Sequence, residues 1–318
     1  MFSEFAMSDL HVVLGATGGL GRTLVETLAR EDRRVRAVSR SMPTSPMDHA
    51  NVEYVAADIT RPDDARRACD GASVVFHAAQ PPYGQWPELF PAMTAQVIKG
   101  AASANAKLVM VDNLYMYGPT NVPLHENLPR NATGRKGMAR AAMETQLLAA
   151  HAEGRVRVTI GRLSDYYGPR GENSALTALV LEPAVRGKAM RWMGSADVPR
   201  TLHYLADGAR GLITLADHDL ADGKVWHLPS APPITGKEFM KLVNDVLPSP
   251  VKTKTLGTTA MKIGGLFSKN AKESIELMYQ WTDPMTVDST SFTNAFGSFD
   301  TVPHATAVAV TLRSLMKS

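Results

Sequence analysis

Residues 11–22 read HVVLGATGGLGR, and this stretch decides the fold of the chain. Four mostly apolar residues run into three glycines with the spacing G-x-x-G-x-x-G. Leucines then recur at every fourth position, at Leu20, Leu24 and Leu28. The pattern predicts a buried strand, a tight turn and an amphipathic helix that packs back on a sheet.

Glycines with this spacing suit a turn that binds a dinucleotide. One glycine permits the sharp turn, one lets the backbone approach a pyrophosphate, and one lets helix and strand pack closely. The first N–H groups of the helix have no partners inside the helix, and the helix dipole adds attraction for phosphate. A glycine-rich turn without a ligand is the alternative. Because strand, turn and helix all fall within the first 30 residues, the context favours dinucleotide binding.

Length and composition bound the class of protein. The 318 residues suit two domains, or one large α/β unit with an appendage. A hydrophobic content of 44% with 20% charged residues is ordinary for a globular protein. The net charge is +3, and the chain has no basic block beyond Arg33-Arg34 and Arg66-Arg67, so we expect no nucleic-acid partner.

The chain also lacks signals for secretion and membrane insertion. Its single cysteine, Cys69, rules out a disulfide framework and favours a reducing, cytoplasmic compartment. Residues 1–7 carry an acid and lack a basic region followed by an apolar core, so they do not form a secretory signal. No apolar run approaches ~20 residues, so we expect no membrane span.

Apolar segments alternate with helical segments in the first part of the chain. The expected strands cover 11–14, 34–40, 52–58, 72–79 and 107–111, and the expected helices cover about 20–28, 60–69 and 87–104. Thr60 is the expected hydroxyl N-cap of the second helix. Alternation of this kind predicts right-handed crossovers and a parallel sheet that binds its ligand at the carboxyl edge.

The end of the second strand indicates which dinucleotide binds. A free ribose 2′-hydroxyl usually meets Asp or Glu here, whereas a 2′-phosphate needs positive charge and hydroxyls. Ser39 and Arg40 supply the latter, with Arg22 as support. The sequence therefore favours NADP over NAD, although a solvated arginine at a strand end is the alternative.

Seven short motifs lie at strand ends, turns and helix starts. They are GATGGLG at 15–21, ADI at 57–59, HAA at 77–79, YGP at 117–119, VTIGR with a later YGP at 158–169, and HYLAD at 203–207. Together they resemble extended short-chain dehydrogenases, the fold of nucleotide-sugar epimerases and dehydratases. The resemblance covers about residues 10–245.

This resemblance implies an α/β fold, a Rossmann-type doubly wound parallel sheet with a smaller C-terminal α/β substrate lid. Residues 8–162 would mainly bind the dinucleotide, and residues 163–318 would mainly bind a small-molecule substrate, with the two parts interleaved. The sequence leaves open whether the protein forms a homodimer.

The resemblance also implies cofactor contacts at matching positions. The aspartate matching Asp58 touches the adenine, and the alanines matching Ala78 and Ala79 line the ribose and phosphate path. With the glycine-rich turn and the strand ends, the expected cofactor-binding residues are Gly15, Thr17, Gly18, Gly19, Leu20, Gly21, Arg22, Ser39, Arg40, Asp58, Ile59, Ala78, Ala79 and Arg140.

The catalytic pattern departs from that of the family. The family uses a tyrosine four residues before a lysine, and the lysine lowers the pKa of the phenol and holds the cofactor ribose. None of the eight tyrosines of this chain is followed four positions later by a lysine. The usual proton relay is therefore absent.

Neighbouring residues show what stands in its place. The family carries a glutamate four residues after the lysine, and Glu144 matches if Arg140 takes the lysine position and Lys136 the tyrosine position. A second register puts Lys136 in the lysine place and Ala132 in the tyrosine place; we prefer the first. Counting back from the first Tyr-Gly-Pro puts Asn113 where the family has serine or threonine.

These substitutes can still do chemistry. Lys136 and Arg140 are one helical turn apart on one face. Arginine can hold ribose hydroxyls but cannot relay a proton, because it is effectively never deprotonated. A lysine can exchange a proton with a substrate, as in some atypical dehydrogenases related to isoflavone reductases, and Asn113 can hydrogen-bond a substrate oxygen. The alternative is that both basic residues merely bind phosphate or solvent.

Other polar residues compete for these roles. Asp165 falls where the family often places a polar residue that faces the substrate. Asp112 is an expected partner of Lys136 or Arg140. The rival proton donors are Tyr115, Tyr117, Tyr166 and Tyr167. The nine histidines show no metal-ligand spacing, so we expect no metal.

The C-terminal part is harder to interpret. It suggests helices at 174–185 and 203–217, a strand at 225–228, and a capping box that opens a helix at Thr235. Residues 250–300 match no pattern that indicates a substrate. The side chains that could line a substrate cleft are Trp192, Met193, Arg200, Trp226 and Met285.

Three functions remain open. The first is an NADP-dependent oxidoreductase that acts on a small carbonyl or hydroxyl compound. The second is a nucleotide-sugar epimerase or dehydratase, which the missing tyrosine disfavours. The third is a dinucleotide-binding sensor without turnover.

Overall fold

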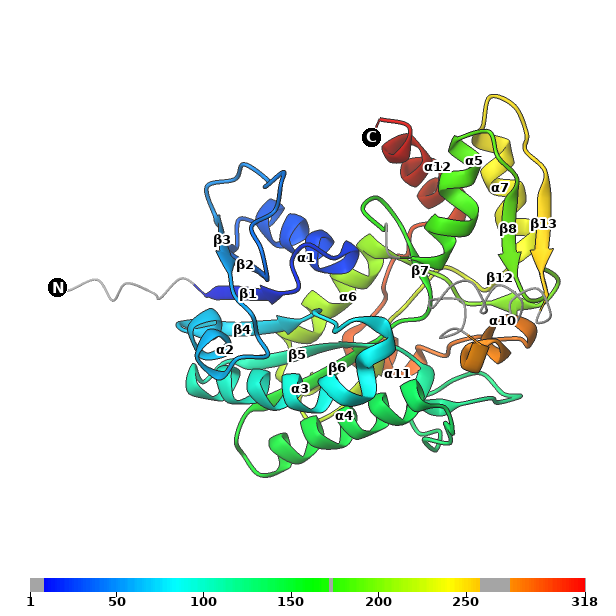
Figure 1. Ribbon diagram of the computed structural model, residues 1–318. Coiled ribbons are helices and arrows are strands. Elements are labelled where there is room, and N and C mark those ends of the chain that lie inside the picture. Colours follow the sequence, from blue (N-terminus) through cyan, green and yellow to red (C-terminus); the bar gives the residue numbers. More distant parts are fainter. Residues whose placement is uncertain (1–8, 172–173, 258–274, 318) are drawn as a thin grey trace.

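A parallel sheet of seven strands forms the centre of the molecule (Figure 1). The computed structural model describes residues 9–171, 174–257 and 275–317. The strand order is β3-β2-β1-β4-β5-β6-β11, and every neighbouring pair is parallel. The strands are β1 (Leu10–Leu14), β2 (Arg34–Ser39), β3 (Val52–Ala56), β4 (Ala72–His77), β5 (Lys107–Asp112), β6 (Arg157–Arg162) and β11 (Val225–His227).

Helices cover both faces of the sheet. On one face lie α1 (Gly19–Arg30) and α6 (Leu205–Asp217), and on the other lie α2 (Pro62–Cys69), α3 (Trp86–Ser103) and α4 (Arg135–Ala152) (Figure 1). The leucine repeat explains α1, because Leu20, Leu24 and Leu28 are all buried against the sheet. The Rossmann-type fold is therefore confirmed.

The strand order reverses between β1 and β4. From β1 the chain adds β2 and β3 on one side, and from β4 it adds β5, β6 and β11 on the other side. Open α/β sheets bind ligands at such a switch point, outside the carboxyl ends of the strands. The glycine-rich turn follows β1 at this edge, so the fold places it where the sequence predicts a dinucleotide.

The expected elements are present, with small differences at their ends. Strand β5 continues to Asp112, and β4 stops at His77. The expected N-cap at Thr60 is wrong: Arg61 is the N-cap of α2, and the Thr60 hydroxyl donates instead to the Asp58 carboxylate at 2.7 Å. Between 174 and 185 the chain forms a π-helix (Thr177–Leu181) and then the short α5 (Glu182–Val185).

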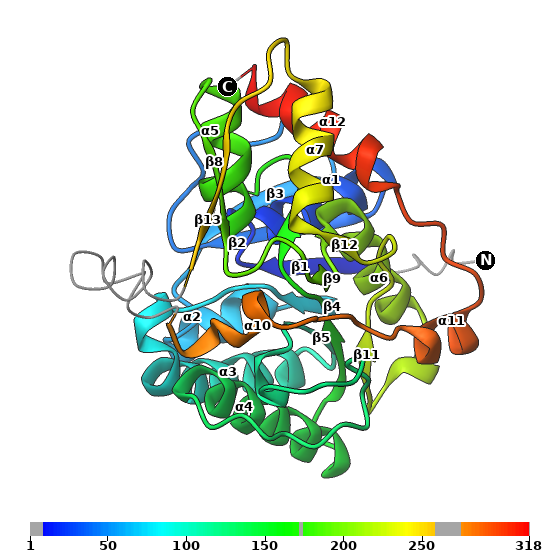
Figure 2. The same cartoon turned by 90° about the vertical axis from the view of Figure 1, so that its right-hand side faces the viewer.

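Three two-stranded sheets and further helices form the C-terminal part (Figure 2). The strand pairs are β7 (Tyr166–Tyr167) with β10 (His203–Tyr204), β8 (Met190–Met193) with β13 (Thr253–Leu256), and β9 (Pro199–Arg200) with β12 (Ile234–Thr235). The remaining α-helices in the described residues are α7 (Gly236–Val246), α10 (Tyr279–Thr282), α11 (Thr290–Phe296) and α12 (His304–Leu315). The capping box at Thr235 is confirmed, because its hydroxyl accepts from the Glu238 amide and the Glu238 carboxylate accepts from the Thr235 amide.

The C-terminal part has its own core, and the chain crosses between the two parts. Trp192 and Met193 belong to this core, which forms around Tyr167 and Phe239. Trp226 does not line a substrate cleft, because it is buried beside Phe296 in the core under α6. Within the described ranges, no helix is both long and apolar enough to cross a membrane.

Candidate functional site

The glycine-rich turn after β1 is close-packed. Gly15 has φ +88°, and a Cβ there would lie 2.6 Å from the backbone of Ala79 at the end of β4. A Cβ on Gly21 would clash with the carbonyl oxygen of Gly15. Both positions therefore need glycine for the turn and for the approach of α1 to the strand.

Gly18 differs from these two glycines, because a side chain at this position would have room. Of the described residues, a Cβ on Gly18 would meet only the Gly15 carbonyl oxygen, at 3.5 Å. Gly18 is the N-cap of α1, no side chain caps it, and the first turn of the helix carries no acidic residue. The first-turn N–H groups therefore fit a pyrophosphate, and Thr17 is exposed beside them.

A distant loop packs against the same turn. A Cβ on Gly19 would lie 2.7 Å from the carbonyl oxygen of Arg170, which itself has φ +69°. Leu20 is buried below. Gly19 is thus needed because the loop after β7 passes over the start of α1, and no local pattern in the sequence indicates this contact.

The residues expected around a 2′-phosphate lie at the end of β2. Ser39 is buried and its hydroxyl donates to the Ser41 carbonyl oxygen at 2.7 Å, while Arg40 is exposed. Arg22 reaches the same loop, 3.4 Å from the Ser45 carbonyl oxygen. Hydrogen bonds from Thr60, and then the charge of Arg40, lower the pKa of Asp58. Positive side chains therefore gather at this edge, and that Asp58 touches adenine stays a prediction.

Helix α4 carries Arg140 into the buried face of the sheet. Its Nη1 lies 3.2 Å from an Asp112 oxygen, which confirms the expected pairing of Asp112 with Arg140. The guanidinium carbon lies 4.4 Å from the ring centroids of both Trp86 and Phe90. The Nε and Nη2 groups of Arg140 are buried and have no partner among the described residues. Unpartnered buried donors fit a group such as a ribose hydroxyl.

Lys136 projects from the same helix toward a different partner. Its Nζ lies 3.0 Å from a carboxylate oxygen of Glu276 and 4.5 Å from the ring centroid of Tyr83. The Lys136 side chain is 3% exposed. Glu276 was not expected from the sequence, because it lies 140 residues further along the chain.

The Asn113 side chain is held by the turn that follows it. Its Oδ1 accepts a hydrogen bond from the backbone amide of Tyr115 at 3.1 Å. The amide nitrogen of Asn113 is the end of this side chain that can donate to a substrate oxygen. The hydroxyls of Tyr115 and Tyr83 interact, and burial, Tyr83 and then Asp165 raise the pKa of Tyr115.

Asp165 and Arg200 form an ion pair in the C-terminal part. The Arg200 guanidinium also lies 3.6 Å from the ring centroid of Trp281. Burial raises the pKa of the Asp165 carboxyl, and the charge of Arg200 opposes that shift. The charges of Asp165 and Arg200 both act on Tyr115, so these two residues face the end of β5.

Most of the chain matches the model of a known protein family. Residues 11–228 match the family described as "NAD dependent epimerase/dehydratase family", which is more than half of the chain. The chain belongs to the NAD dependent epimerase/dehydratase family. The resemblance seen in the motifs is thereby confirmed.

A curated protein and several solved structures are similar to this chain. A ceramide reductase of Caulobacter vibrioides is 32% identical over 113 residues, which are 34% of this chain and 36% of that protein. The match therefore spans about a third of that relative. UDP-glucuronic acid 4-epimerase from Bacillus cereus in complex with NAD is 14% identical with a TM-score of 0.79, over 97% of this chain and 99% of that one.

A second solved structure gives the same result. dTDP-glucose 4,6-dehydratase from Bacillus anthracis in complex with NAD is 15% identical with a TM-score of 0.80, over 97% of each chain. At these identities the solved structures show a shared fold.

A row of polar residues stands at the ends of three adjacent strands. In register at the carboxyl edge lie Asp112 of β5, Arg162 of β6 and His227 of β11. Arg162 donates to an Asp112 oxygen at 3.0 Å, to the Tyr117 hydroxyl at 2.7 Å and to Glu144 at 2.5 Å. Tyr117 is therefore part of a buried hydrogen-bond network.

His77 ends β4 beside this row. It is fully buried, and its two ring nitrogens have no partner among the described residues. Burial, and then the charge of Arg140, lower the pKa of His77 to about 3. The end of β4 thus adds a neutral imidazole next to the unpartnered donors of Arg140.

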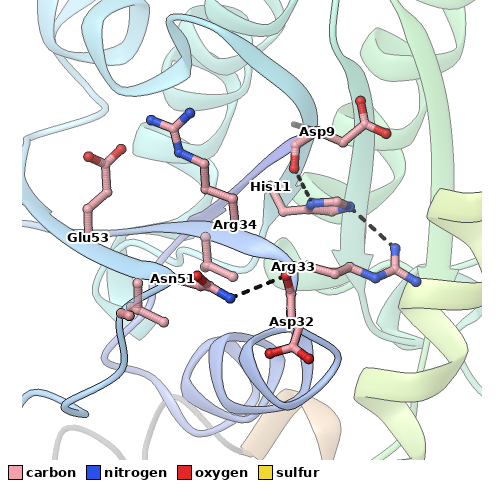
Figure 3. A pocket seen from close by; sticks show the side chains of 10 residues that line it. Asp9, His11, Asp32, Arg33, Arg34, Asn51 and Glu53 are labelled. Atoms are coloured by element: carbon pink, nitrogen blue, oxygen red, sulfur yellow. Dashed lines mark hydrogen bonds between the residues drawn. The ribbon is translucent and has the colours of Figure 1, made fainter. Parts of the chain in front are cut away.

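A hollow of about 700 Å³ lies at the opposite edge of the sheet (Figure 3). Asp9, His11, Arg33 and Glu53 are among its lining residues. Arg33 pairs with Asp217. The His11 ring contacts the Asp9 carbonyl oxygen at 3.0 Å and the Arg33 guanidinium at 3.4 Å (Figure 3). This hollow lies at the amino ends of the strands, away from the glycine-rich turn. In the described parts of the chain, no three His, Cys, Asp or Glu side chains are grouped to hold a metal ion.

Proposed function

We propose that this chain is an atypical NADP-dependent oxidoreductase of its family that acts on a small carbonyl or hydroxyl compound. The observation that carries the proposal is the pair Lys136 and Arg140, both buried on α4 beside the carboxyl ends of β4 and β5. Lys136 forms an ion pair with Glu276, and Arg140 keeps two buried donors that have no partner among the described residues. A site in which Arg140 binds a ribose beside a Lys136 amine that exchanges protons accounts for both of these features.

The residues present fit the cofactor. The first turn of α1 and the open position at Gly18 would hold the pyrophosphate, and Arg140 would hold ribose hydroxyls through Nε and Nη2. The nicotinamide dinucleotide supplies or accepts a hydride. Lys136 would give a proton to the substrate oxygen or take it, and the Asn113 amide would orient that oxygen.

The preference for NADP rests on charge. Arg40 and Arg22 both approach the end of β2, and Ser39 adds a hydroxyl there. A 2′-phosphate forms charge-assisted hydrogen bonds with such groups. The similar solved structures above hold NAD, so the second strand end is where we expect this chain to differ from them.

A sensor without turnover is the second candidate. It is favoured by the ion pairs that engage Lys136 with Glu276 and Asp165 with Arg200, because both pairs occupy groups that could act on a substrate. Nucleotide-sugar chemistry is a third candidate, suggested by the epimerase and dehydratase among the similar structures.

Replacing Lys136 with Met tests the proposal. Oxidation of NADPH should first be screened over small carbonyl compounds and nucleotide sugars. Lys136→Met should lower turnover roughly 10²- to 10⁴-fold, because it removes the proton donor, while NADPH affinity changes less than about threefold. NADPH binding is measured by cofactor fluorescence.

Lys224→Met is the matched control. Lys224 also lies over an aromatic ring, 5.6 Å from the Trp226 centroid, but it is exposed and far from the site. Turnover that survives Lys136→Met removes this residue from the mechanism. NADPH binding without turnover of any substrate by the unmodified protein supports the sensor instead.

A further inference from the structure

His77 is a buried histidine whose ring makes no hydrogen bond within the described parts of the chain. It is 0% exposed, and neither Nδ1 nor Nε2 has a partner among the described residues. Because burial lowers its pKa to about 3, the ring is neutral at neutral pH. A neutral imidazole carries one N–H donor and one nitrogen that accepts. Buried polar groups left unpaired lower the stability of a protein, so both nitrogens call for a partner.

The strand register places this ring on the same face of the sheet as Arg140. Successive side chains of a strand alternate between the two faces. His77 therefore shares a face with Val75, which packs in the core beneath α3 and α4. On β5, Met110 lies opposite His77 and belongs to the same core, so Asp112, two residues farther on, faces that side as well. Arg140 reaches this face from α4 and pairs with Asp112 there.

Arg140 brings unpaired donors to the same place. It is 0% exposed, and its guanidinium carbon lies 4.4 Å from the ring centroids of Trp86 and Phe90 on α3. Its Nη1 is engaged with Asp112, while Nε and Nη2 have no partner among the described residues. The charge of Arg140 is the second cause that lowers the pKa of His77, which agrees with the register in placing the two side chains near each other.

These two groups are complementary to one kind of ligand. A guanidinium only donates hydrogen bonds, whereas the unprotonated nitrogen of a neutral imidazole accepts one. A hydroxyl group satisfies both, because its oxygen accepts from the guanidinium while its O–H donates to the imidazole. A carboxylate or a phosphate would accept from Arg140 but would leave the accepting nitrogen of His77 unpaired. An apolar group would leave both unpaired.

We propose that His77 and Arg140 form a buried subsite for a hydroxyl group, which accepts from the guanidinium and donates to the imidazole. This inference rests on the proposed function, in which Arg140 holds ribose hydroxyls. Ala78 and Ala79 follow His77 directly, and a Cβ on Gly15 would lie 2.6 Å from the Ala79 backbone, so the subsite adjoins the glycine-rich turn. The hydroxyl comes either from the nicotinamide ribose of the dinucleotide or from a sealed water molecule.

Imidazole ¹⁵N NMR tests the inference without turnover and on the unmodified protein. The shifts of the two ring nitrogens report which one carries the proton and whether the other accepts a hydrogen bond, and His77→Phe assigns them. For the ribose hydroxyl, the accepting nitrogen should shift on saturation with NADPH. Adenosine 2′,5′-bisphosphate, which lacks the nicotinamide ribose, should leave it unchanged. For a sealed water, the hydrogen bond should be present already in the free protein.

Affinities provide the second measurement. For the ribose hydroxyl, His77→Phe should weaken NADPH binding roughly 3- to 10-fold, which is the effect of one lost hydrogen bond, and binding of adenosine 2′,5′-bisphosphate should change less than about twofold. For a sealed water, both ligands should bind His77→Phe as they bind the unmodified protein. Isothermal titration measures both affinities.

His203 is the matched control, because it is equally buried but paired at both nitrogens. Its Nδ1 accepts from the Ser164 amide at 3.1 Å, and its Nε2 faces the Leu228 carbonyl oxygen at 2.9 Å. The His203 signals should not respond to NADPH. His203→Phe should lower the midpoint of thermal unfolding of the free protein, because it leaves these partners unpaired. His77→Phe, which removes no hydrogen bond to a described residue, should lower it much less.

The outcomes are distinguishable. An accepting nitrogen of His77 without a hydrogen bond, in the free protein and with NADPH alike, overturns the inference. A hydrogen bond that forms only with NADPH supports the ribose hydroxyl, and one present throughout supports the water. A chain that binds no dinucleotide defeats the proposed function, and the imidazole signals of the free protein still report on the subsite.

Discussion

Arg40 is the residue that should decide between the two dinucleotides. It is exposed at the end of β2, and its charge acts on Asp58 at the same edge of the sheet. Arg40→Ala should weaken NADPH binding roughly 10- to 100-fold, since a charge-assisted hydrogen bond to the 2′-phosphate contributes about 1.5–3 kcal/mol. NADH binding should change less than about threefold, and isothermal titration measures both.

Arg61→Ala is the control for this prediction. The Arg61 charge also acts on Asp58, but it lies on the α2 side and not at the end of β2. Equal losses of NADPH and NADH affinity in Arg40→Ala would defeat the phosphate assignment.

At the scale of elements, four adjacent strands end in buried titratable side chains beneath α4. Two of these are histidines, His77 on β4 and His227 on β11. Burial, and then the charge of Arg162, lower the pKa of His227 to about 3. Its Nδ1 faces the carbonyl oxygens of Leu124 and Asp288, so Nδ1 carries the proton and Nε2 accepts from the Tyr117 hydroxyl at 2.7 Å.

The His227 ring makes the free energy of unfolding depend on pH. Its pKa in the folded state lies below the ordinary value of 6.5, so the unfolded chain binds the proton first as pH falls. The stability that this histidine contributes is present above pH 6.5 and is lost as pH falls from there toward 3. The loss is about 1.4 kcal/mol per pH unit for each such histidine.

Urea unfolding at pH 7.5, 5.5 and 4.5 checks this expectation. His227→Gln should reduce the loss of stability between pH 5.5 and 4.5 by about 1.4 kcal/mol, because one proton fewer is taken up on unfolding. His218→Gln, which replaces an exposed histidine, is the control variant. An identical pH slope in both variants would show that His227 titrates alike in the folded and unfolded chain.

The sequence predicts elements better than it predicts the contacts between them. The turn at Gly15 and the leucine stripe of α1 follow from local periodicity, and both are confirmed. The sequence left Lys136 and Arg140 as alternative partners of Asp112. The rotation of α4 about its own axis decides between them, and it places Arg140 against Asp112. Glu276 carries no local pattern, because its role arises where a distant segment meets the start of α4.

At the scale of the whole molecule, the segment from Glu276 to Val287 connects the two parts of the chain. It begins at α4, and the Trp281 carbonyl oxygen then accepts from the Ser195 amide at 2.8 Å in the C-terminal part. Farther on, the Met285 amide donates to the Pro199 carbonyl oxygen at 3.1 Å. In Figure 2, α10 lies between the helices of the first part and the strands β8 and β13.

Gly194→Ala should disturb this connection. Gly194 has φ +65°, and a Cβ there would clash with the Trp281 carbonyl oxygen. A left-handed conformation costs an alanine about 1–2 kcal/mol, and the clash should add roughly 1–3 kcal/mol. Thermal unfolding measures the total, and faster limited proteolysis near Trp281 would locate the change.

Gly187→Ala separates strain from clash. Gly187 has φ +67°, but a Cβ there would meet nothing within 4 Å. It should lose only the contribution of the left-handed conformation, and equal losses in the two variants would show that the clash with the Trp281 carbonyl oxygen costs no stability.

The packing of Arg170 over Gly19 has a consequence for synthesis on the ribosome. The strand, turn and helix of the glycine-rich site are complete once residue 30 has emerged, but the loop that covers the start of α1 comes about 140 residues later. At ~5–20 residues per second this delay is roughly 7 to 30 seconds. During that time the nascent chain presents the N-terminus of α1 without the loop that covers it in the folded protein.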